Sequence, residues 1–211
     1  MNEYDYLEEL TSRYECLKPI KTDIKEAYEI LKNSFEHGGK LLIAGNGGSC
    51  ADAEHIVGEL MKSFVKKRPI SEEIAEKMKQ EDAIMGTKLA EKLQKGLPAI
   101  ALTGHTGLTT AFANDVDPEM AFAQQVMGYG KPGDVFLGLT TSGNSKNVLY
   151  AVTVAKAKGM KVIGLTGRDG GMMKKVSDAS IVVPEEETYK IQELHLPVYH
   201  ALCLMLENYF F

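Results

Sequence analysis

Five short runs of apolar residues, rich in valine, isoleucine and leucine, set the strongest limit on how this chain can fold. None of them alternates apolar with polar residues, and this is the pattern of strands that are buried on both faces of a sheet. The runs cover residues 40–44, 98–103, 134–140, 161–166 and 179–183. Helical stretches lie between them, at residues 50–64, 71–95, 106–127, 145–158 and 172–177. This alternation predicts an α/β fold, a doubly wound parallel sheet of five strands with right-handed crossovers.

Amphipathic helices are predicted on both flanks of this region, at residues 4–16, 22–36 and 185–209. We expect residues 1–211 to form a single domain, with N-terminal helices over 1–38 and a charge-rich helical insertion over 66–96. One straight helix over 71–95 would be longer than a small sheet is wide, so we expect a break near residues 80–82 or at Gly86. Its spaced aliphatic residues should pack against the same domain or a neighbouring subunit, and the flanking helices offer a surface for oligomerisation.

Composition excludes several classes of function. The 211 residues are 44% hydrophobic and 25% charged, as in globular proteins that fold around a core. The net charge of −5 lacks the basic surface that nucleic-acid binding requires, so no nucleic-acid partner is expected. No apolar run approaches the length of a membrane span, so no membrane partner is expected either. Three cysteines without a CxxC pair fit a reducing compartment, which predicts a cytoplasmic protein.

Two loops at the predicted carboxyl ends of strands carry residues suited to an anion, and ligands of open parallel sheets bind at that edge. Residues 45–49 read Gly-Asn-Gly-Gly-Ser and lead into a helix, whose free N–H groups favour an anion or a polar oxygen. Residues 140–145 read Thr-Thr-Ser-Gly-Asn-Ser, again just before a helix, and four hydroxyls exceed what capping needs. A plain glycine turn and ordinary capping by Ser142 or Ser145 are the alternatives.

Titratable residues recur on two predicted helices. His55 and Glu59 are four residues apart and therefore share a helix face. On the last helix, His200 lies about 140° from His195 around the axis, so both cannot face one site. Histidines that are satisfied within the core remain the alternative for each. The pair Asn114-Asp115 fits either a sugar-hydroxyl contact or a turn that ends a helix.

Taken together, these motifs resemble those of the bacterial sedoheptulose-7-phosphate isomerases, or phosphoheptose isomerases, of the sugar isomerase (SIS) domain superfamily. The resemblance extends over nearly the whole chain. It is carried by residues 45–55 (GNGGSCADAEH), 113–115 (AND), 141–145 (TSGNS), 164–171 (GLTGRDGG) and 191–193 (IQE), followed by His200. It departs from the family at the insertion after Arg68-Pro69, where typical members have a short loop.

The resemblance implies a flavodoxin-like SIS fold, a homotetramer and a sugar-phosphate substrate. It also implies interconversion of sedoheptulose 7-phosphate and D-glycero-D-manno-heptose 7-phosphate in heptose biosynthesis, for lipopolysaccharide, capsule or S-layer glycans. By position, Glu59 and His200 match catalytic residues, and His55, Glu59, Gln192 and His200 match ligands of Zn²⁺. Matches to substrate contacts are Asn46, Gly47, Gly48, Asn114, Asp115, Thr140, Thr141, Ser142, Ser145 and Gln192.

The chemistry of an aldose-ketose isomerase gives these residues a purpose. A proton moves between C1 and C2 through an ene-diol, which needs a base, a proton donor and stabilisation of a developing oxyanion. Glu59 and His200 can supply the first two, and Zn²⁺ can polarise the carbonyl. One alternative is a non-catalytic SIS adaptor resembling the DnaA initiator-associating protein. Another is an isomerase or binding protein for a different sugar phosphate, whose phosphate loop would look the same.

Overall fold

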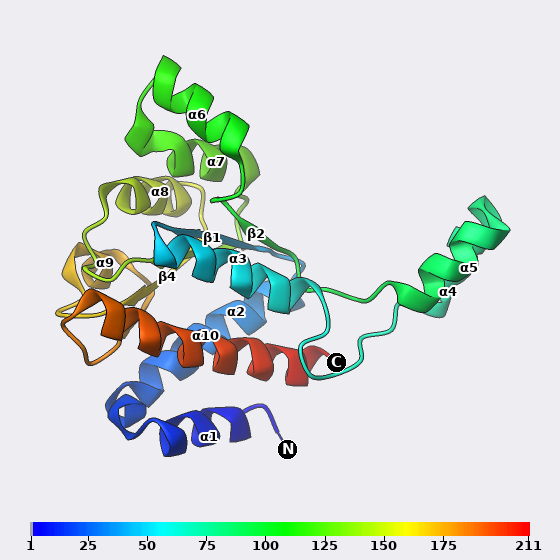
Figure 1. Cartoon of the computed structure of the whole chain (residues 1–211), viewed down its shortest axis with the longest axis horizontal. Coiled ribbons are helices and arrows are strands. Elements are labelled where there is room, and N and C mark those ends of the chain that lie inside the picture. Colours follow the sequence, from blue (N-terminus) through cyan, green and yellow to red (C-terminus); the bar gives the residue numbers. More distant parts are fainter. Residues whose placement is uncertain (1) are drawn as a thin grey trace.

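The computed structural model of the chain describes residues 2–211 and is built on a sheet of five parallel strands (Figure 1). The strand order is β2-β1-β3-β4-β5, which is the flavodoxin-like doubly wound order. Leu41 of β1 pairs with Ala99 of β2 on one side and with Val135 of β3 on the other. The predicted fold class is confirmed. The strands are β1 (Leu41–Gly45), β2 (Ala99–Ala101), β3 (Val135–Leu139), β4 (Lys161–Thr166) and β5 (Ala179–Val182).

Helices cover both faces of the sheet, because successive strand residues point to opposite sides. Leu41 and Ile43 face the layer of α2 (Lys21–Glu36), α3 (Gly48–Met61) and α10 (Thr188–Phe210), over which α1 (Asp5–Arg13) packs. Leu42 and Ala44 face the layer of α7 (Ala121–Tyr129), α8 (Lys146–Ala157) and α9 (Gly171–Val176). Every residue of β1 and β3 is buried, as the apolar runs predict.

Two predicted helices are shorter or more broken than expected. The N-terminal helix ends at Arg13 and is followed by a 3-10 turn, η1 (Glu15–Ile20), which contains Pro19. The helix predicted over 106–127 is instead α6 (Thr106–Asp115), a 3-10 turn η2 (Pro118–Met120) and α7. Pro118 cannot donate a backbone hydrogen bond, and the side chain of Asp117 caps the new turn by accepting from the N–H of Glu119 at 2.8 Å.

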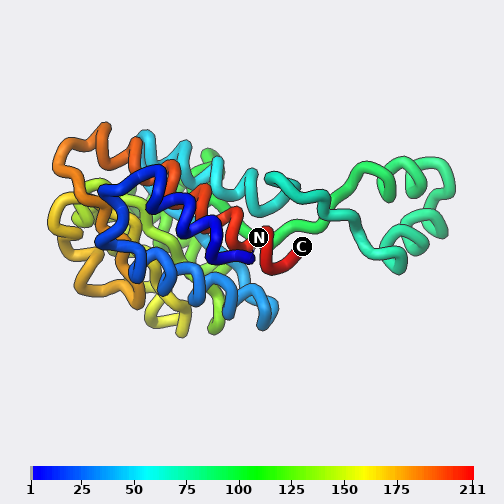
Figure 2. The backbone as a smooth tube through the Cα atoms, turned by 90° about the horizontal axis from the view of Figure 1, so that it is seen from below, coloured from blue at the N-terminus to red at the C-terminus, as the bar shows by residue number. Residues whose placement is uncertain are grey.

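The insertion forms a helical hairpin of α4 (Glu72–Glu81) and α5 (Ala83–Lys92). Its break lies in the predicted region, where the Asp82 side chain accepts from the N–H groups of Ile84 and Met85 at 3.0 and 2.7 Å and so starts α5. The expectation that the insertion packs on its own domain is wrong. The hairpin projects from the body, and within residues 2–211 its helices pack on each other (Figures 1 and 2).

A membrane-spanning helix is absent from residues 2–211, where every helix is too short or too polar to cross a bilayer.

Candidate active site

The glycine loop and the hydroxyl loop lie side by side at the carboxyl edge of β1 and β3. The side-chain amides of Asn46 and Asn147 exchange two hydrogen bonds of 2.9 Å, which tie the start of α3 to the start of α8. Thr140 Oγ1 lies 2.8 Å from Ser145 Oγ. Ser145 stands at the N-cap position of α8, yet within residues 2–211 its side chain makes no capping hydrogen bond. Two helix N-termini therefore converge on one hollow.

That hollow holds most of the predicted substrate contacts. It is lined by the glycine loop, by Thr140, Thr141 and Ser145, and by Gln192 from α10. Gln192 lies so close to the glycine loop that a Cβ on Gly48 would be 2.6 Å from its amide nitrogen. Ser142 does not line the hollow, and its hydroxyl accepts from the N–H of Asn144 at 3.2 Å.

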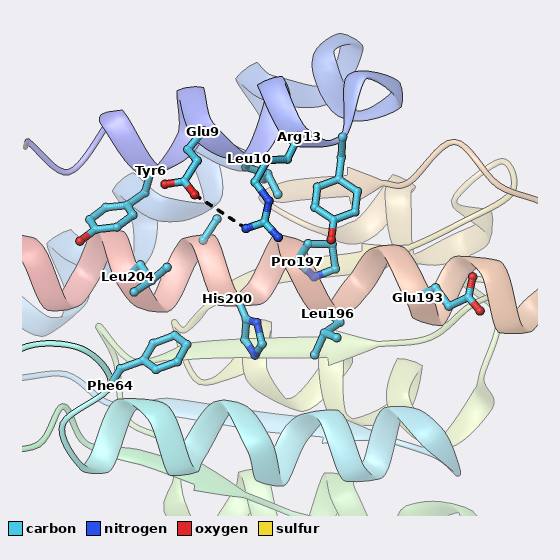
Figure 3. Close-up of a pocket in the computed structure, with 12 residues that line it drawn as sticks. Tyr6, Glu9, Leu10, Arg13, Phe64, Glu193, Leu196, Pro197, His200 and Leu204 are labelled. Atoms are coloured by element: carbon cyan, nitrogen blue, oxygen red, sulfur yellow. Dashed lines mark ion pairs between the residues drawn. The ribbon is translucent and has the colours of Figure 1, made fainter.

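A second hollow continues the first along the seam between α3 and α10. Gly48 and Gln192 line both, and Asp52, Glu193 and Leu196 lead along the two helices. His200 follows one turn after Leu196, and Figure 3 shows its imidazole directed from α10 toward α3. A further groove, between α1 and α10, reaches His200 from the other side (Figure 3). The seam thus leads from the two loops toward His200.

His55, Glu59 and His200 form one cluster across this seam. His55 Nε2 lies 3.3 Å from Glu59 Oε1 and 3.5 Å from His200 Nε2. The other carboxylate oxygen of Glu59 is 3.0 Å from Lys62 Nζ. Burial and the neighbouring His55 lower the pKa of His200, and the negative Glu59 opposes them. The surroundings of His200 therefore favour its neutral form.

A buried tyrosine orients His55. The hydroxyl of Tyr199 donates to Asp52 Oδ1 at 3.1 Å and lies 3.0 Å from His55 Nδ1. Since that hydroxyl has only one proton, His55 Nδ1 must be the donor in the second bond. In neutral His55 the lone pair is then on Nε2, which faces Glu59 and His200. Burial raises the pKa of Asp52, against the opposing effects of the Tyr199 hydrogen bond and of His55.

These donor atoms suit a zinc ion in part. Two ligands of a tetrahedral zinc ion at about 2.0–2.1 Å are separated by about 3.3 Å, close to both distances measured from His55 Nε2. The lone pair on His55 Nε2 and the carboxylate of Glu59 repel each other unless a cation or a proton lies between them. Among residues 2–211, however, no three His, Cys, Asp or Glu side chains are already arranged to hold a metal ion. Gln192, the predicted fourth ligand, has its amide against Gly48 instead.

Comparison with known proteins places the chain in a family. A profile of the SIS domain matches residues 5–95 and 80–167, most of the sequence. The chain belongs to the SIS domain family.

Within this family its relatives are phosphoheptose isomerases. It is 40% identical to that of Helicobacter pylori over 92% of this chain and 88% of the relative. It is 38% identical to that of Nitratiruptor over 99% of this chain and 97% of the relative. The solved phosphoheptose isomerase GmhA of Neisseria gonorrhoeae matches with a TM-score of 0.74 and 33% identity, over 95% and 93% of the two chains. This SIS-domain protein is therefore an isomerase of the phosphoheptose isomerase group.

Two predicted contacts of this SIS domain lie away from the seam. Asn114 and Asp115 stand at the exposed end of α6, where their side chains bond to each other at 2.8 Å. The structure does not bring them to the glycine loop within one chain, because α6 follows the edge strand β2 and lies beyond the layer of α7 and α8 (Figure 1). Their role in binding stays a prediction.

His195 is fully buried, and burial lowers its pKa to about 4, so it is a neutral core residue.

Sequence reasoning missed three residues that hold the site together. Asp52 lies three residues before His55, and this spacing could have indicated a shared helix face. Tyr199 has the pattern of an ordinary core aromatic, and Asn147 lies 101 residues from its partner Asn46. For the last two the sequence has no signal, because their partners come from distant segments.

Proposed function

We propose that this chain converts sedoheptulose 7-phosphate to D-glycero-D-manno-heptose 7-phosphate in heptose biosynthesis. The observation that carries the proposal is the seam between α3 and α10, which has the two loops at one end and the cluster of His55, Glu59 and His200 one turn beyond Leu196. Along α3, the rise from Gly48 to His55 is about 10 Å at 1.5 Å per residue. A seven-carbon chain has six C–C bonds of about 1.5 Å, so a phosphate held in the loops puts C1 and C2 beside the cluster.

The residues of the seam would divide the chemistry as follows. The N–H groups at the starts of α3 and α8 and the hydroxyls of Thr140 and Ser145 would bind the phosphate. Glu59 would take a proton from C1 of the ketose and return it to C2. His200 would pass a proton from O1 to O2, because a neutral imidazole has one donor and one acceptor nitrogen. C2 becomes a carbinol and C1 becomes the aldehyde.

We also propose that His55, Glu59 and His200 hold Zn²⁺, with Gln192 turning from Gly48 to join them. When bound, the ion would stabilise the negative charge on the sugar oxygens. The hydrogen bond from His55 to Tyr199 supports this role, since ligating histidines commonly use their second nitrogen in this way. To test the proposal, the protein would be treated with a chelator and measured for metal content and activity before and after zinc is returned. Full activity in protein shown to be metal-free would refute it.

The activity is tested by incubating the purified full chain with sedoheptulose 7-phosphate and following aldose phosphate by NMR. Appearance of the aldose supports the proposal. The adaptor alternative expects no turnover, but an adaptor has no need for a carboxylate and an imidazole that converge from α3 and α10. Turnover of a different ketose phosphate, with none of sedoheptulose 7-phosphate, would refute the substrate and keep the reaction class.

The protein is further proposed to act as a cytoplasmic homotetramer. The three free cysteines fit a reducing compartment. Assembly would give a role to α6, which has no buried residue in the described chain and exposes Leu108 beside Asn114 and Asp115. A neighbouring copy that covered α6 would bring this polar pair to an interface.

A further inference from the structure

The α4–α5 hairpin is the one large feature that the isomerase site does not explain. It leaves the body on two extended segments, which are joined by the bridge between Pro69 and Gln94 and by a 2.7 Å bond from the N–H of Lys95 to the carbonyl of Arg68. Beyond this root the two helices project into open space (Figure 2). No other helix or strand among residues 2–211 makes more than a marginal contact with them.

A hairpin of this size needs a partner. Isolated helices shorter than about 12–15 residues are marginal in water, and α4 and α5 have 10 residues each. In the described chain the only buried residue of the two helices is Gly86, whose Cβ position is 2.2 Å from the carbonyl oxygen of Met78, so the helices touch backbone to backbone there. The rest of α5 leaves apolar side chains in solvent.

These apolar side chains form a stripe. Met85, Leu89 and Leu93 follow one another at intervals of four residues and are 62%, 44% and 48% exposed. Ile84 is 85% exposed, and Ile74 on α4 is 47% exposed. Single exposed apolar residues are ordinary, but a stripe along a projecting hairpin is the surface of a contact with another protein.

The charges around the stripe indicate what covers it. Helix α4 has four glutamates and two lysines, and both lysines pair with their own helix, Lys77 with Glu73 and Lys79 with Glu76. Glu72 and Glu81 form no ion pair with any described residue. Helix α5 has two lysines and one glutamate, and Lys88 and Lys92 are likewise without an ion pair in residues 2–211. At 100° per residue, Glu72 and Glu81 lie on opposite sides of α4, and Glu81 shares the face of Ile74. Helix α4 therefore offers one unpaired acid beside Ile74, and α5 offers two unpaired bases.

We propose that the α4–α5 hairpin docks on the same hairpin of a second copy of this chain, with α4 of each copy beside α5 of the other. A two-fold axis makes such a contact self-complementary, because the contact between α4 of one copy and α5 of the other then occurs twice. The arrangement is a four-helix bundle with the apolar stripes inside and Glu81 of each copy facing Lys88 and Lys92 of the other. The reverse pairing, α4 on α4, would set glutamates against glutamates. The contact is separate from the flanking helices and independent of the proposed activity.

The test measures the mass of the full chain by sedimentation over a range of concentrations. Replacing Leu89 and Leu93 with serine should raise the dissociation constant of the assembly about 10-fold or more. The matched control is Met172→Ser, which changes an apolar side chain of 47% exposure on α9 and should leave the mass unchanged. Circular dichroism checks that each variant is folded.

Charge reversal tests the pairing itself. Lys88→Glu with Lys92→Glu should weaken association to a similar extent at low salt, and adding Glu81→Lys should restore it at least in part. The proposal is overturned if the wild-type chain is a monomer at every concentration. It is also overturned if the serine variant keeps the wild-type mass, because the stripe would then not lie in a contact between copies. It is also overturned if the threefold charge variant associates no better than the double lysine variant, since α4 would then not lie beside α5.

Discussion

Replacement of Glu207 by glutamine should be among the most damaging conservative changes in this protein. The carboxylate of Glu207 is fully buried and accepts four hydrogen bonds: from the N–H groups of Phe64, Val65 and Lys66 at 2.8, 2.9 and 3.1 Å, and from Arg68 Nε at 2.8 Å. This acceptor cluster fixes the loop after α3 to the end of α10.

Arg68 extends the same cluster to α3. Its guanidinium donates to the backbone carbonyls of Leu60 and Glu59 at 2.7 and 3.0 Å, which are groups that the end of α3 leaves unpaired. The guanidinium also lies 4.7 Å from the centre of the Phe211 ring. Both side chains of the ion pair are wholly inaccessible to solvent. Loss of the Glu207 charge therefore leaves a buried, uncompensated cation.

The magnitude follows from the count of acceptors. The single amide oxygen of glutamine can accept two of the four hydrogen bonds, and each lost bond to a charged group is worth about 1.5–3 kcal/mol. The sum agrees with the about 3–5 kcal/mol observed when a buried ion pair is broken. For a domain of this size, each kcal/mol corresponds to about 2–4 °C, so the midpoint of unfolding should fall by about 6–20 °C.

The assay is urea or thermal unfolding of wild type and Glu207→Gln at one protein concentration. The matched control is Glu73→Gln, which removes the exposed pair with Lys77, and such helix pairs contribute only about 0.3–0.5 kcal/mol. If Glu207→Gln were no more harmful than this control, the inference that the buried cluster stabilises the protein would be refuted.

The pH dependence gives a second readout. Burial opposes ionisation of Glu207, but the three N–H groups and Arg68 outweigh it and lower its pKa. A lowered pKa in the folded state contributes stability above the unfolded value of about 4.3 and loses it as the pH falls through the folded value. The difference between wild type and Glu207→Gln should therefore be full at pH 7 and shrink at acid pH.

Three further outcomes concern the candidate active site. Glu59→Gln and His200→Asn should each lower turnover by about 10²- to 10⁴-fold with an unchanged circular dichroism spectrum, and near-normal rates in both would refute their assignment. Tyr199→Phe should reduce activity or zinc affinity by about 10- to 100-fold while its buried ring keeps the fold, and wild-type values for both would show that the hydroxyl does not orient His55. Gly48→Ala should raise KM more than it lowers kcat, because the new methyl group displaces Gln192 from the phosphate hollow, and an unchanged KM would count against that placement.

The sequence by itself determined the sheet, the order of helices and the position of the glycine loop and the hydroxyl loop. Buried parallel strands need continuous apolar runs, and glycine and hydroxyl residues before a helix are local signals that the chain carries wherever it folds. The break in the insertion at Asp82 was also predictable, since a side chain that caps a helix acts within three residues of itself. In each case the physical cause and its effect lie close together along the chain.

Only the tertiary structure decided which distant residues meet. His55 and Tyr199 are 144 residues apart, and Glu207 reaches Phe64 across 143. These residues meet because α3 and α10 pack against each other, and no local sequence pattern predicts that packing. The same holds for the hairpin, whose apolar spacing predicted a buried face, although in the described chain the body of the protein does not cover it. Periodicity shows that a helix face is suited to burial, whereas the path of the chain at Pro69 and Gln94 decides which surface it can reach.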